Sequence, residues 1–211
     1  YQYLQKSEVL SFEEIYSIAK IFYSLGVKKI RITGGEPLLR NNLSDLIGLL
    51  NKMDDLDLAV TTNGILLKKQ ALELHQAGLK RVTVSLDSVE ESTFKILSDS
   101  PYSYLRVLEG IEASIAAGIK IKVNAVIKKN INDGQILQMV NHFRNTNVVL
   151  RFIEYMDVGN SNQWLHDEVV PSKLLQDKIN EVYPLKKLDK NYNSEVAERF
   201  KLQDDSLELG F

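Results

Sequence analysis

The chain contains no cysteine among its 211 residues. It can therefore form no disulfide, no thiolate metal site and no cysteine nucleophile from its own side chains. No apolar run approaches the roughly 20 residues that cross a bilayer. The opening residues, YQYLQKSEVL, also lack the basic start and apolar middle of a signal peptide. We therefore expect a cytoplasmic protein that makes no membrane contact.

Strong charge of either sign is also missing, because the formal net charge is −2. Such a chain has no overall attraction to nucleic acid or to an anionic membrane. Aromatic and basic residues do not interleave, and no Gly-x-Gly-x-x-Gly or Walker phosphate loop is present. The three histidines, His75, His142 and His166, have no partner at ligand spacing. These observations argue against nucleic-acid binding and against a histidine metal site.

One phrase recurs three times: SLGVKKIRIT, QAGLKRVTVS and AAGIKIKVNA. In each, a helical pattern ends at a glycine, which is followed by an apolar residue, a lysine and a strand pattern. A glycine in the left-handed conformation ends many helices. A helix that repeatedly leads into a strand predicts βαβ units and a parallel sheet. The three glycines are Gly26, Gly78 and Gly118.

Capping patterns suggest where the helices begin: Ser11 with Glu14 and Ser88 with Glu91 have capping-box spacing, and Asn42 resembles a looser version. The predicted helices lie near 12–25, 43–53, 67–77, 89–97, 104–117, 134–145 and 172–182, and the predicted strands near 28–33, 57–61, 80–86, 120–127 and 149–155.

The last residues differ in character from the rest of the chain. Pro184 ends the last predicted helix, and EVAERFKL and SLELGF then resemble the two strands of a hairpin. We expect residues 1–184 to form a partial barrel and residues 185–211 to begin a separate C-terminal β region.

Polar residues alternate with apolar ones along the predicted strands, which places the polar ones on one face. A doubly wound sheet would bury these charges beneath helices, at a high cost unless every charge is paired. An open barrel would place them in a lumen that holds water and ligand, and we prefer it to a polar face that is merely solvated. The residues concerned are Arg31, Thr33, Arg81, Thr83, Ser85, Lys122 and Asn124.

The carboxyl ends of parallel strands are where ligands bind in α/β folds. After the first predicted strand, Gly34 and Gly35 allow a ligand to approach the backbone, and Glu36 offers an acceptor for an ammonium group. A plain tight turn is the alternative for this Gly-Gly-Glu-Pro stretch.

Three cations, Arg31, Lys122 and Arg151, lie on or near the polar face of three different strands. Their convergence in a chain of negative net charge favours an anionic ligand such as a polyphosphate. Three solvated or paired surface cations are the alternative.

The phrases KKIRITGGEPLLR, VTTNGILL, AGLKRVTVSLDS, KVNAVIKKNIND and LRFIEYMDVGN follow one another along nearly the whole chain. In this order they resemble the radical S-adenosylmethionine superfamily and, within it, the GTP 3',8-cyclase family of molybdenum cofactor biosynthesis. The resemblance implies an α/β fold, an incomplete (βα)6 TIM-like barrel without its first strand and cluster loop, followed by the start of a C-terminal β hairpin.

The resemblance also implies ligands for individual residues. By analogy Gly34, Gly35, Glu36, Ser85 and Met156 would contact S-adenosylmethionine, with Glu36 near its amino group; Arg31, Thr61 and Lys122 match positions that contact GTP.

In the family reaction, a reduced 4Fe-4S cluster cleaves S-adenosylmethionine to a 5'-deoxyadenosyl radical, which takes hydrogen from the GTP ribose. The implied partners are GTP, S-adenosylmethionine and a downstream cyclic pyranopterin monophosphate synthase, and the resemblance allows a homodimer. Iron-sulfur clusters are held by cysteine thiolates, and the two clusters that the family uses have no ligands here.

We therefore expect an internal part of a longer cyclase, inactive without its cluster-binding ends. Two alternatives stay open at this point, a nucleotide-binding module without catalysis and a different radical S-adenosylmethionine enzyme.

Overall fold

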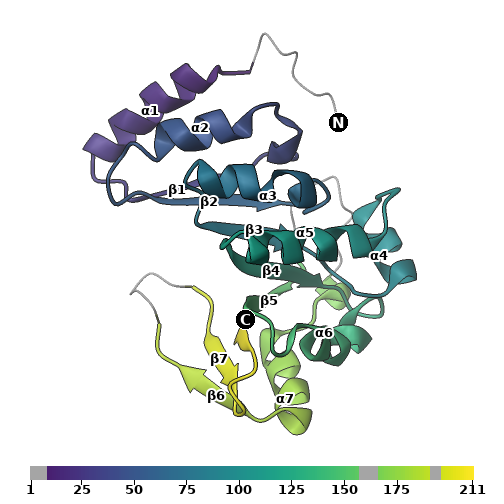
Figure 1. The fold of residues 1–211 in the computed structure, drawn as a ribbon. Coiled ribbons are helices and arrows are strands. Elements are labelled where there is room, and N and C mark those ends of the chain that lie inside the picture. Colours follow the sequence, from purple (N-terminus) through teal and green to yellow (C-terminus); the bar gives the residue numbers. More distant parts are fainter. Residues whose placement is uncertain (1–8, 157–165, 191–195) are drawn as a thin grey trace.

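The computed structural model describes residues 9–156, 166–190 and 196–211. Its 8-stranded sheet has the order β1-β2-β3-β4-β5-β8-β7-β6 (Figure 1). Strands β1 to β5 and β8 pair in parallel, whereas β7 pairs antiparallel with both β6 and β8. The strands are β1 (Lys29–Ile32), β2 (Asp57–Thr62), β3 (Arg81–Ser85), β4 (Lys120–Ile127), β5 (Val148–Glu154), β6 (Leu185–Leu188), β7 (Arg199–Leu202) and β8 (Glu208–Gly210).

Seven α-helices accompany these strands in the described residues: α1 (Phe12–Ser24), α2 (Leu43–Leu50), α3 (Leu67–Gln76), α4 (Glu91–Ser98), α5 (Tyr104–Ala116), α6 (Ile136–Phe143) and α7 (Ser172–Val182). Three short 3₁₀ helices are η2 (Pro37–Leu39), η3 (Asp133–Gln135) and η4 (His166–Glu168). All twelve predicted helices and strands are confirmed, with shifts of a few residues at their ends.

The three glycines after helices have the predicted left-handed conformation, with φ of 95° at Gly26, 108° at Gly78 and 92° at Gly118. In each case the next amide returns to the helix, as when the Leu79 amide donates to the Leu74 carbonyl at 3.0 Å. The glycine therefore ends each helix and turns the chain into the next strand.

Of the three predicted capping patterns, only the first is confirmed. Ser11 and Glu14 form a complete capping box at the start of α1. Asn42 has a φ of 58° and makes no capping hydrogen bond, because its backbone is left-handed. The helix after Ser88 is capped instead by Glu90, whose longer carboxylate reaches the amides of the first turn.

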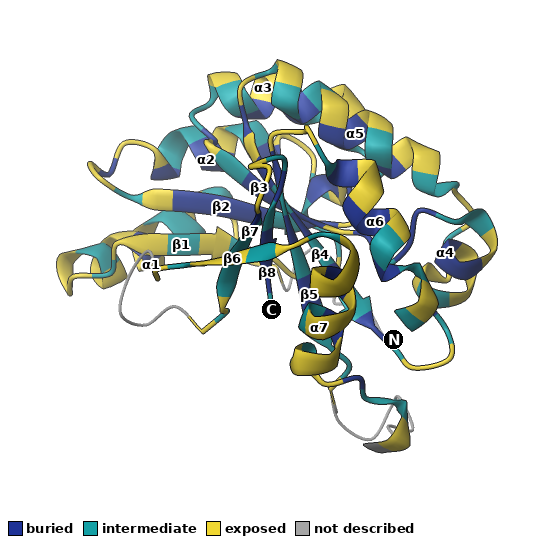
Figure 2. Cartoon of the chain, turned by 90° about the horizontal axis from the view of Figure 1, so that it is seen from below, coloured by how far each residue is buried: buried dark blue, intermediate teal, exposed yellow. Residues whose placement is uncertain are grey.

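The two faces of the sheet differ in their surroundings. Helices α2, α3, α5 and α6 lie along one face (Figure 2). The side chains of β2 to β4 on that face are buried, and in β4 buried and half-buried residues alternate from Ile121 onward. Sequential strand order with a row of helices along one face is the arrangement of a barrel, and the predicted incomplete TIM-like barrel is confirmed.

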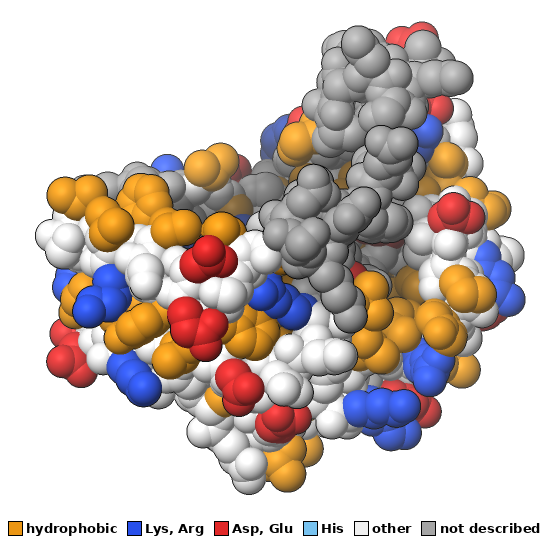
Figure 3. All heavy atoms as spheres, turned by 90° about the horizontal axis from the view of Figure 1, so that it is seen from above, with side chains coloured by type: hydrophobic (Ala, Val, Ile, Leu, Met, Phe, Trp, Pro, Cys, Tyr) orange, Lys and Arg blue, Asp and Glu red, His pale blue; other side chains and the backbone are white. Residues whose placement is uncertain are grey.

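Helix α1 sits beside α2 near the β1 edge of the sheet. Ile18, Ile21 and Phe22 of α1 are exposed, as is Leu25 directly after the helix. Figure 3, which views this end from above, shows hydrophobic side chains in a row on the left. None of the helices in the described ranges is long and apolar enough to span a membrane.

The predicted C-terminal hairpin is confirmed as β7 and β8. Strand β8 pairs in parallel with β5, so the hairpin extends the main sheet. Strand β6, which the sequence did not predict, adds a further antiparallel neighbour to β7. A domain division at residue 184 stays a prediction.

Candidate functional site

The concave face of the sheet, opposite the helices, carries a polar row across its centre. In the strand register Thr61 lies beside Thr83, and Thr83 lies beside Lys122. Arg31 reaches this row from β1: its Nη1 donates to Thr61 Oγ1 at 2.7 Å and to Thr83 Oγ1 at 3.0 Å. The structure thus joins Arg31 directly to Thr61 and places Lys122 one strand further along. We call Arg31, Thr61, Thr83 and Lys122 the central row.

A second polar row lies two residues closer to the carboxyl ends of the strands. Ser85 pairs in register with Asn124, and Asn124 pairs with Arg151. Ser85 is exposed. The Oδ1 atom of Asn124 is buried and accepts no hydrogen bond from the described residues. A buried amide oxygen without a partner is costly, so this position suits a ligand that brings a donor.

The glycine turn follows β1. Gly34 has a φ of 148°, and a Cβ atom added there would meet nothing within 4 Å, so the backbone is open to a ligand. Gly35 is exposed beside it. A ligand can therefore approach the main chain of the turn directly.

Glu36 fixes this turn to the neighbouring strand end. Its Oε1 accepts from the Thr62 hydroxyl at 2.6 Å and from the Leu38 amide at 3.0 Å, and its Oε2 accepts from the Asn63 amide at 2.7 Å. A carboxylate that accepts three hydrogen bonds is held in one orientation. The observed role of Glu36 is to connect the ends of β1 and β2, and its predicted contact with an amino group stays a prediction.

Strands β3 and β4 are joined at their carboxyl ends by two side chains. Asp87 Oδ1 accepts from the Val126 amide at 2.8 Å, and burial raises the pKa of Asp87. Asn132 donates to the carbonyls of both Asp87 and Val126 at 2.8 Å and accepts from the Lys128 amide. These bonds continue the sheet where the strand ladder ends, and so hold Ser85 near the rim.

The segment after β5 is held by Lys128. Its Nζ lies 2.8 Å from Glu168 Oε2 and 4.6 Å from the centre of the Tyr155 ring, and the hydrogen bond to Glu168 raises the pKa of Lys128. Met156, which follows Tyr155, is 56% exposed. The residues directly after Met156, including Asp157 of the quoted phrase, lie outside the described residues.

Three further charged side chains of these strands have partners, Arg81 and Asp57 on the concave face and Glu154 on the helix-covered face of β5. Arg81 forms a bidentate ion pair with Asp57, with contacts of 2.5 and 2.7 Å. Glu154 Oε1 accepts from the Ser172 amide at 2.5 Å and thereby caps α7. Arg31, Lys122 and Arg151 lie on the same face of the sheet, and an anion bound by them stays a prediction.

One hollow adjoins the central row, and another lies beside Glu36. A cavity of about 650 Å³ at the amino-terminal ends of β3 to β5 is lined by Thr83 and Lys122 among others. A smaller one of about 300 Å³ is lined by Glu36, Asn63 and Tyr102.

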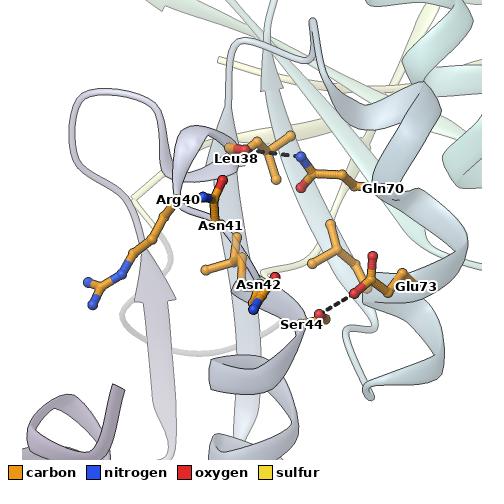
Figure 4. Close-up of a pocket in the computed structure, with 9 residues that line it drawn as sticks. Leu38, Arg40, Asn41, Asn42, Ser44, Gln70 and Glu73 are labelled. Carbon is orange, nitrogen blue, oxygen red and sulfur yellow. Dashed lines mark hydrogen bonds between the residues drawn. The ribbon is translucent and has the colours of Figure 1, made fainter. Parts of the chain in front are cut away.

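A third hollow, also about 300 Å³, lies beside α2 and α3 and contains none of the predicted site residues (Figure 4). In this hollow the Gln70 side chain of α3 donates to the Leu38 carbonyl, and Glu73 of α3 accepts from the Ser44 hydroxyl. These hydrogen bonds connect α3 to η2 and α2, so the hollow has a structural role.

The family model of the radical SAM superfamily matches residues 2–143. The chain belongs to this superfamily. It is 44% identical to a GTP 3',8-cyclase of Staphylococcus epidermidis over 211 residues, which is 100% of this chain and 62% of that protein. It is 47% identical over 204 residues to a GTP 3',8-cyclase of Xanthomonas axonopodis pv. citri, covering 96% of this chain and 61% of that protein. The chain thus spans less than two thirds of the length of these curated relatives.

Solved structures of other proteins share the fold at low sequence identity. Native anSMEcpe with bound AdoMet superposes with a TM-score of 0.63 at 17% identity, covering 84% of this chain and 54% of that one. Methylornithine synthase gives a TM-score of 0.62 at 14% identity, with coverage of 81% and 52%. These likenesses establish the fold alone.

Sequence reasoning placed Thr83 and Asn124 on the polar face but did not include them in the site. The signal was present, because both alternate with apolar residues in the sequence, as Arg31 and Lys122 do. Their partners, however, lie on other strands, which spacing along the chain does not reveal.

Proposed function

We propose that the protein containing this chain is a GTP 3',8-cyclase of molybdenum cofactor biosynthesis. It would convert GTP to (8S)-3',8-cyclo-7,8-dihydroguanosine 5'-triphosphate with S-adenosylmethionine. The observation that carries the proposal is the central row, in which Arg31 is bonded to two threonines and Lys122 lies beside them. The names of the relatives support the same conclusion.

The central row would bind the anionic part of GTP. A guanidinium and an ammonium group form charge-assisted hydrogen bonds with phosphate oxygens, which are stronger than neutral ones. Lys122 is half-buried, and salt screens its charge less than it would on an open surface. Arg31 and Lys122 would thus orient the nucleotide, with the Thr61 hydroxyl as a further contact.

The second row and the glycine turn fit S-adenosylmethionine. The buried Asn124 Oδ1 needs a donor, which a ribose hydroxyl supplies, and the exposed Ser85 hydroxyl lies beside it. The open backbone at Gly34 and Gly35 would receive the methionine end, and Met156 would lie at the opposite side of the site. S-adenosylmethionine, when bound and reductively cleaved, supplies the 5'-deoxyadenosyl radical. This chain's share is to hold the two ligands next to each other and keep water out.

The 4Fe-4S clusters do not fit this chain. It has no cysteine, and the described residues contain no group of three or more His, Asp or Glu side chains placed to hold a metal ion. The thiolates would have to come from outside these 211 residues.

The product would be consumed by a cyclic pyranopterin monophosphate synthase. The protein itself would be a cytoplasmic homodimer.

The test is an anaerobic assay of the full-length protein after cluster reconstitution, with GTP carrying deuterium at the 3' carbon. We expect deuterium in 5'-deoxyadenosine and a cyclised nucleotide of unchanged phosphate number, both detected by mass spectrometry. The matched controls are ATP in place of GTP, and GTP deuterated at the 2' carbon.

A nucleotide-binding module without catalysis is the second candidate, favoured by the absence of cysteine from the chain. GTP binding by a full-length protein that holds no iron would support it and would overturn the cyclase.

A further inference from the structure

The Arg31 side chain extends from β1 across β2 to reach its second hydrogen-bond partner, which lies on β3. Its backbone belongs to β1, Thr61 lies on β2 and Thr83 lies on β3. The residue opposite Arg31 in the register is Ala59, on β2. Ala59 is only 1% exposed although it lies on the concave face, so neighbouring side chains cover its methyl group. A small residue at this position leaves room for the arginine to lie across β2.

Thr83 is better placed than Thr61 to fix the guanidinium. It is only 4% exposed, whereas Thr61 is half-buried. Threonine has few rotamers, and a buried threonine hydroxyl has little freedom to turn towards water. Nη1 carries two N–H groups, and it donates to two threonines on adjacent strands. Two acceptors for one nitrogen fix the plane of the guanidinium as well as its position.

We propose that Thr83 and Ala59 are positioning residues that hold the Arg31 guanidinium ready for the phosphates of GTP. The inference rests on the proposed function, because it takes GTP as the ligand of the central row. Arginine loses considerable rotamer freedom when it is held in one place. If Thr83 and Ala59 hold the Arg31 side chain in place before the nucleotide binds, GTP binding does not have to offset that loss of entropy. The two residues then determine affinity for the nucleotide without touching it.

A purely structural role for Thr83 makes different predictions. If its hydroxyl only satisfied a buried hydrogen bond, loss of that hydroxyl would lower stability and leave ligand affinities alone. A positioning role instead weakens GTP binding selectively, and only while Arg31 is present. Thr83→Val removes the hydroxyl and keeps the shape, whereas Thr83→Ser keeps the hydroxyl.

The experiment is calorimetric titration of the full-length protein with GTP and, separately, with S-adenosylmethionine. We expect Thr83→Val to weaken GTP binding about three- to tenfold, as loss of one hydrogen bond predicts, and to leave S-adenosylmethionine binding within about twofold. Thr83→Ser should bind GTP as the unaltered protein does. In an Arg31→Ala background, Thr83→Val should cause no further loss. Ala59→Val should weaken GTP binding in the same selective way.

The control variant is Thr93→Val, which removes the hydroxyl of another buried threonine, in α4. It should lower the melting temperature and leave GTP binding unchanged. The role of Thr83 would be overturned if the Thr83→Val variant binds GTP normally. It would also be overturned if Thr83→Val weakens GTP binding equally with and without Arg31. Ala59→Val with normal GTP binding would overturn the role of Ala59. If the unaltered protein binds S-adenosylmethionine but no GTP, the proposed function itself fails.

Discussion

On the outer face of the sheet, Val84, Val123 and Leu150 are fully buried beneath the helices. On the concave face, one residue away along the same strands, Ser85 is exposed and Lys122 and Asn124 are half-buried. Alternate residues of one strand therefore serve different purposes. The outer residues supply the apolar burial that stabilises the domain, and the concave ones hold charge where a ligand can use it.

The largest expected effect is on the outer face. Leu150→Ala should lower the free energy of unfolding by about 2 to 5 kcal/mol, because it leaves a cavity in a closed core. Val149 is the matched control, since it is adjacent in β5, lies on the concave face and is half-buried. Val149→Ala should lower the free energy of unfolding by less than about half of that amount, as measured by urea denaturation. Equal losses of unfolding free energy in the two variants would contradict the claim that the outer face stabilises the domain more than the concave face does.

The next effect belongs to the concave face. Lys122→Ala should weaken GTP binding by about 1.5 to 3 kcal/mol, the cost of losing a hydrogen bond to a charged group. The free energy of unfolding should change by no more than about 1 kcal/mol. Lys69→Ala, which removes an exposed lysine from α3, should affect neither quantity. Strong destabilisation by Lys122→Ala, with GTP binding intact, would make Lys122 a structural residue.

The smallest effect concerns Asp87, where the sheet ends. Burial raises its pKa in the folded state, so the fold prefers the protonated form. Ionisation therefore destabilises the fold as pH rises above the unfolded value of about 3.9. Asp87→Asn should increase stability at pH 7, by about 1.4 kcal/mol per unit of pKa difference, and the gain should vanish near pH 3. A gain that is equal at both pH values would contradict burial as the cause.

Glu90, three residues later, provides the opposite control. Hydrogen bonds from the Ser92 and Thr93 side chains lower its pKa to about 2. Its contribution to stability is present above the unfolded pKa and is lost as pH falls towards 2. Glu90→Gln should therefore lower the melting temperature at pH 7 and have a much smaller effect near pH 2. The two substitutions should thus have opposite effects at pH 7.

The helix-to-strand phrases were enough to predict the parallel sheet, because Gly26, Gly78 and Gly118 report local backbone geometry. The pairing of β8 with β5 could not be read in the same way, since parallel partners are far apart in the chain and leave no turn between them. Strand β6 escaped prediction because it has four residues, two of them exposed lysines.

The polar concave face was predicted in outline for the same physical reason, whereas the ligands assigned to it stay predictions. Alternation showed which side chains share the concave face, so Arg31 and Lys122 could be named. The hydrogen bond from Arg31 to Thr83 spans 52 positions of sequence, and no spacing rule reaches that far. The sequence also did not predict that Glu90, and not Ser88, caps α4. Both residues can cap a helix, and the backbone conformation decides which one does.

The most direct test of the nucleotide site is a pair of titrations of the full-length protein and its Arg31→Ala variant, one with GTP and one with S-adenosylmethionine. The account predicts that the variant binds GTP at least about tenfold more weakly, as loss of charge-assisted hydrogen bonds requires. Its affinity for S-adenosylmethionine should stay within about twofold. Equal weakening of both ligands, or unchanged GTP binding, would contradict the claim that the central row is the nucleotide site.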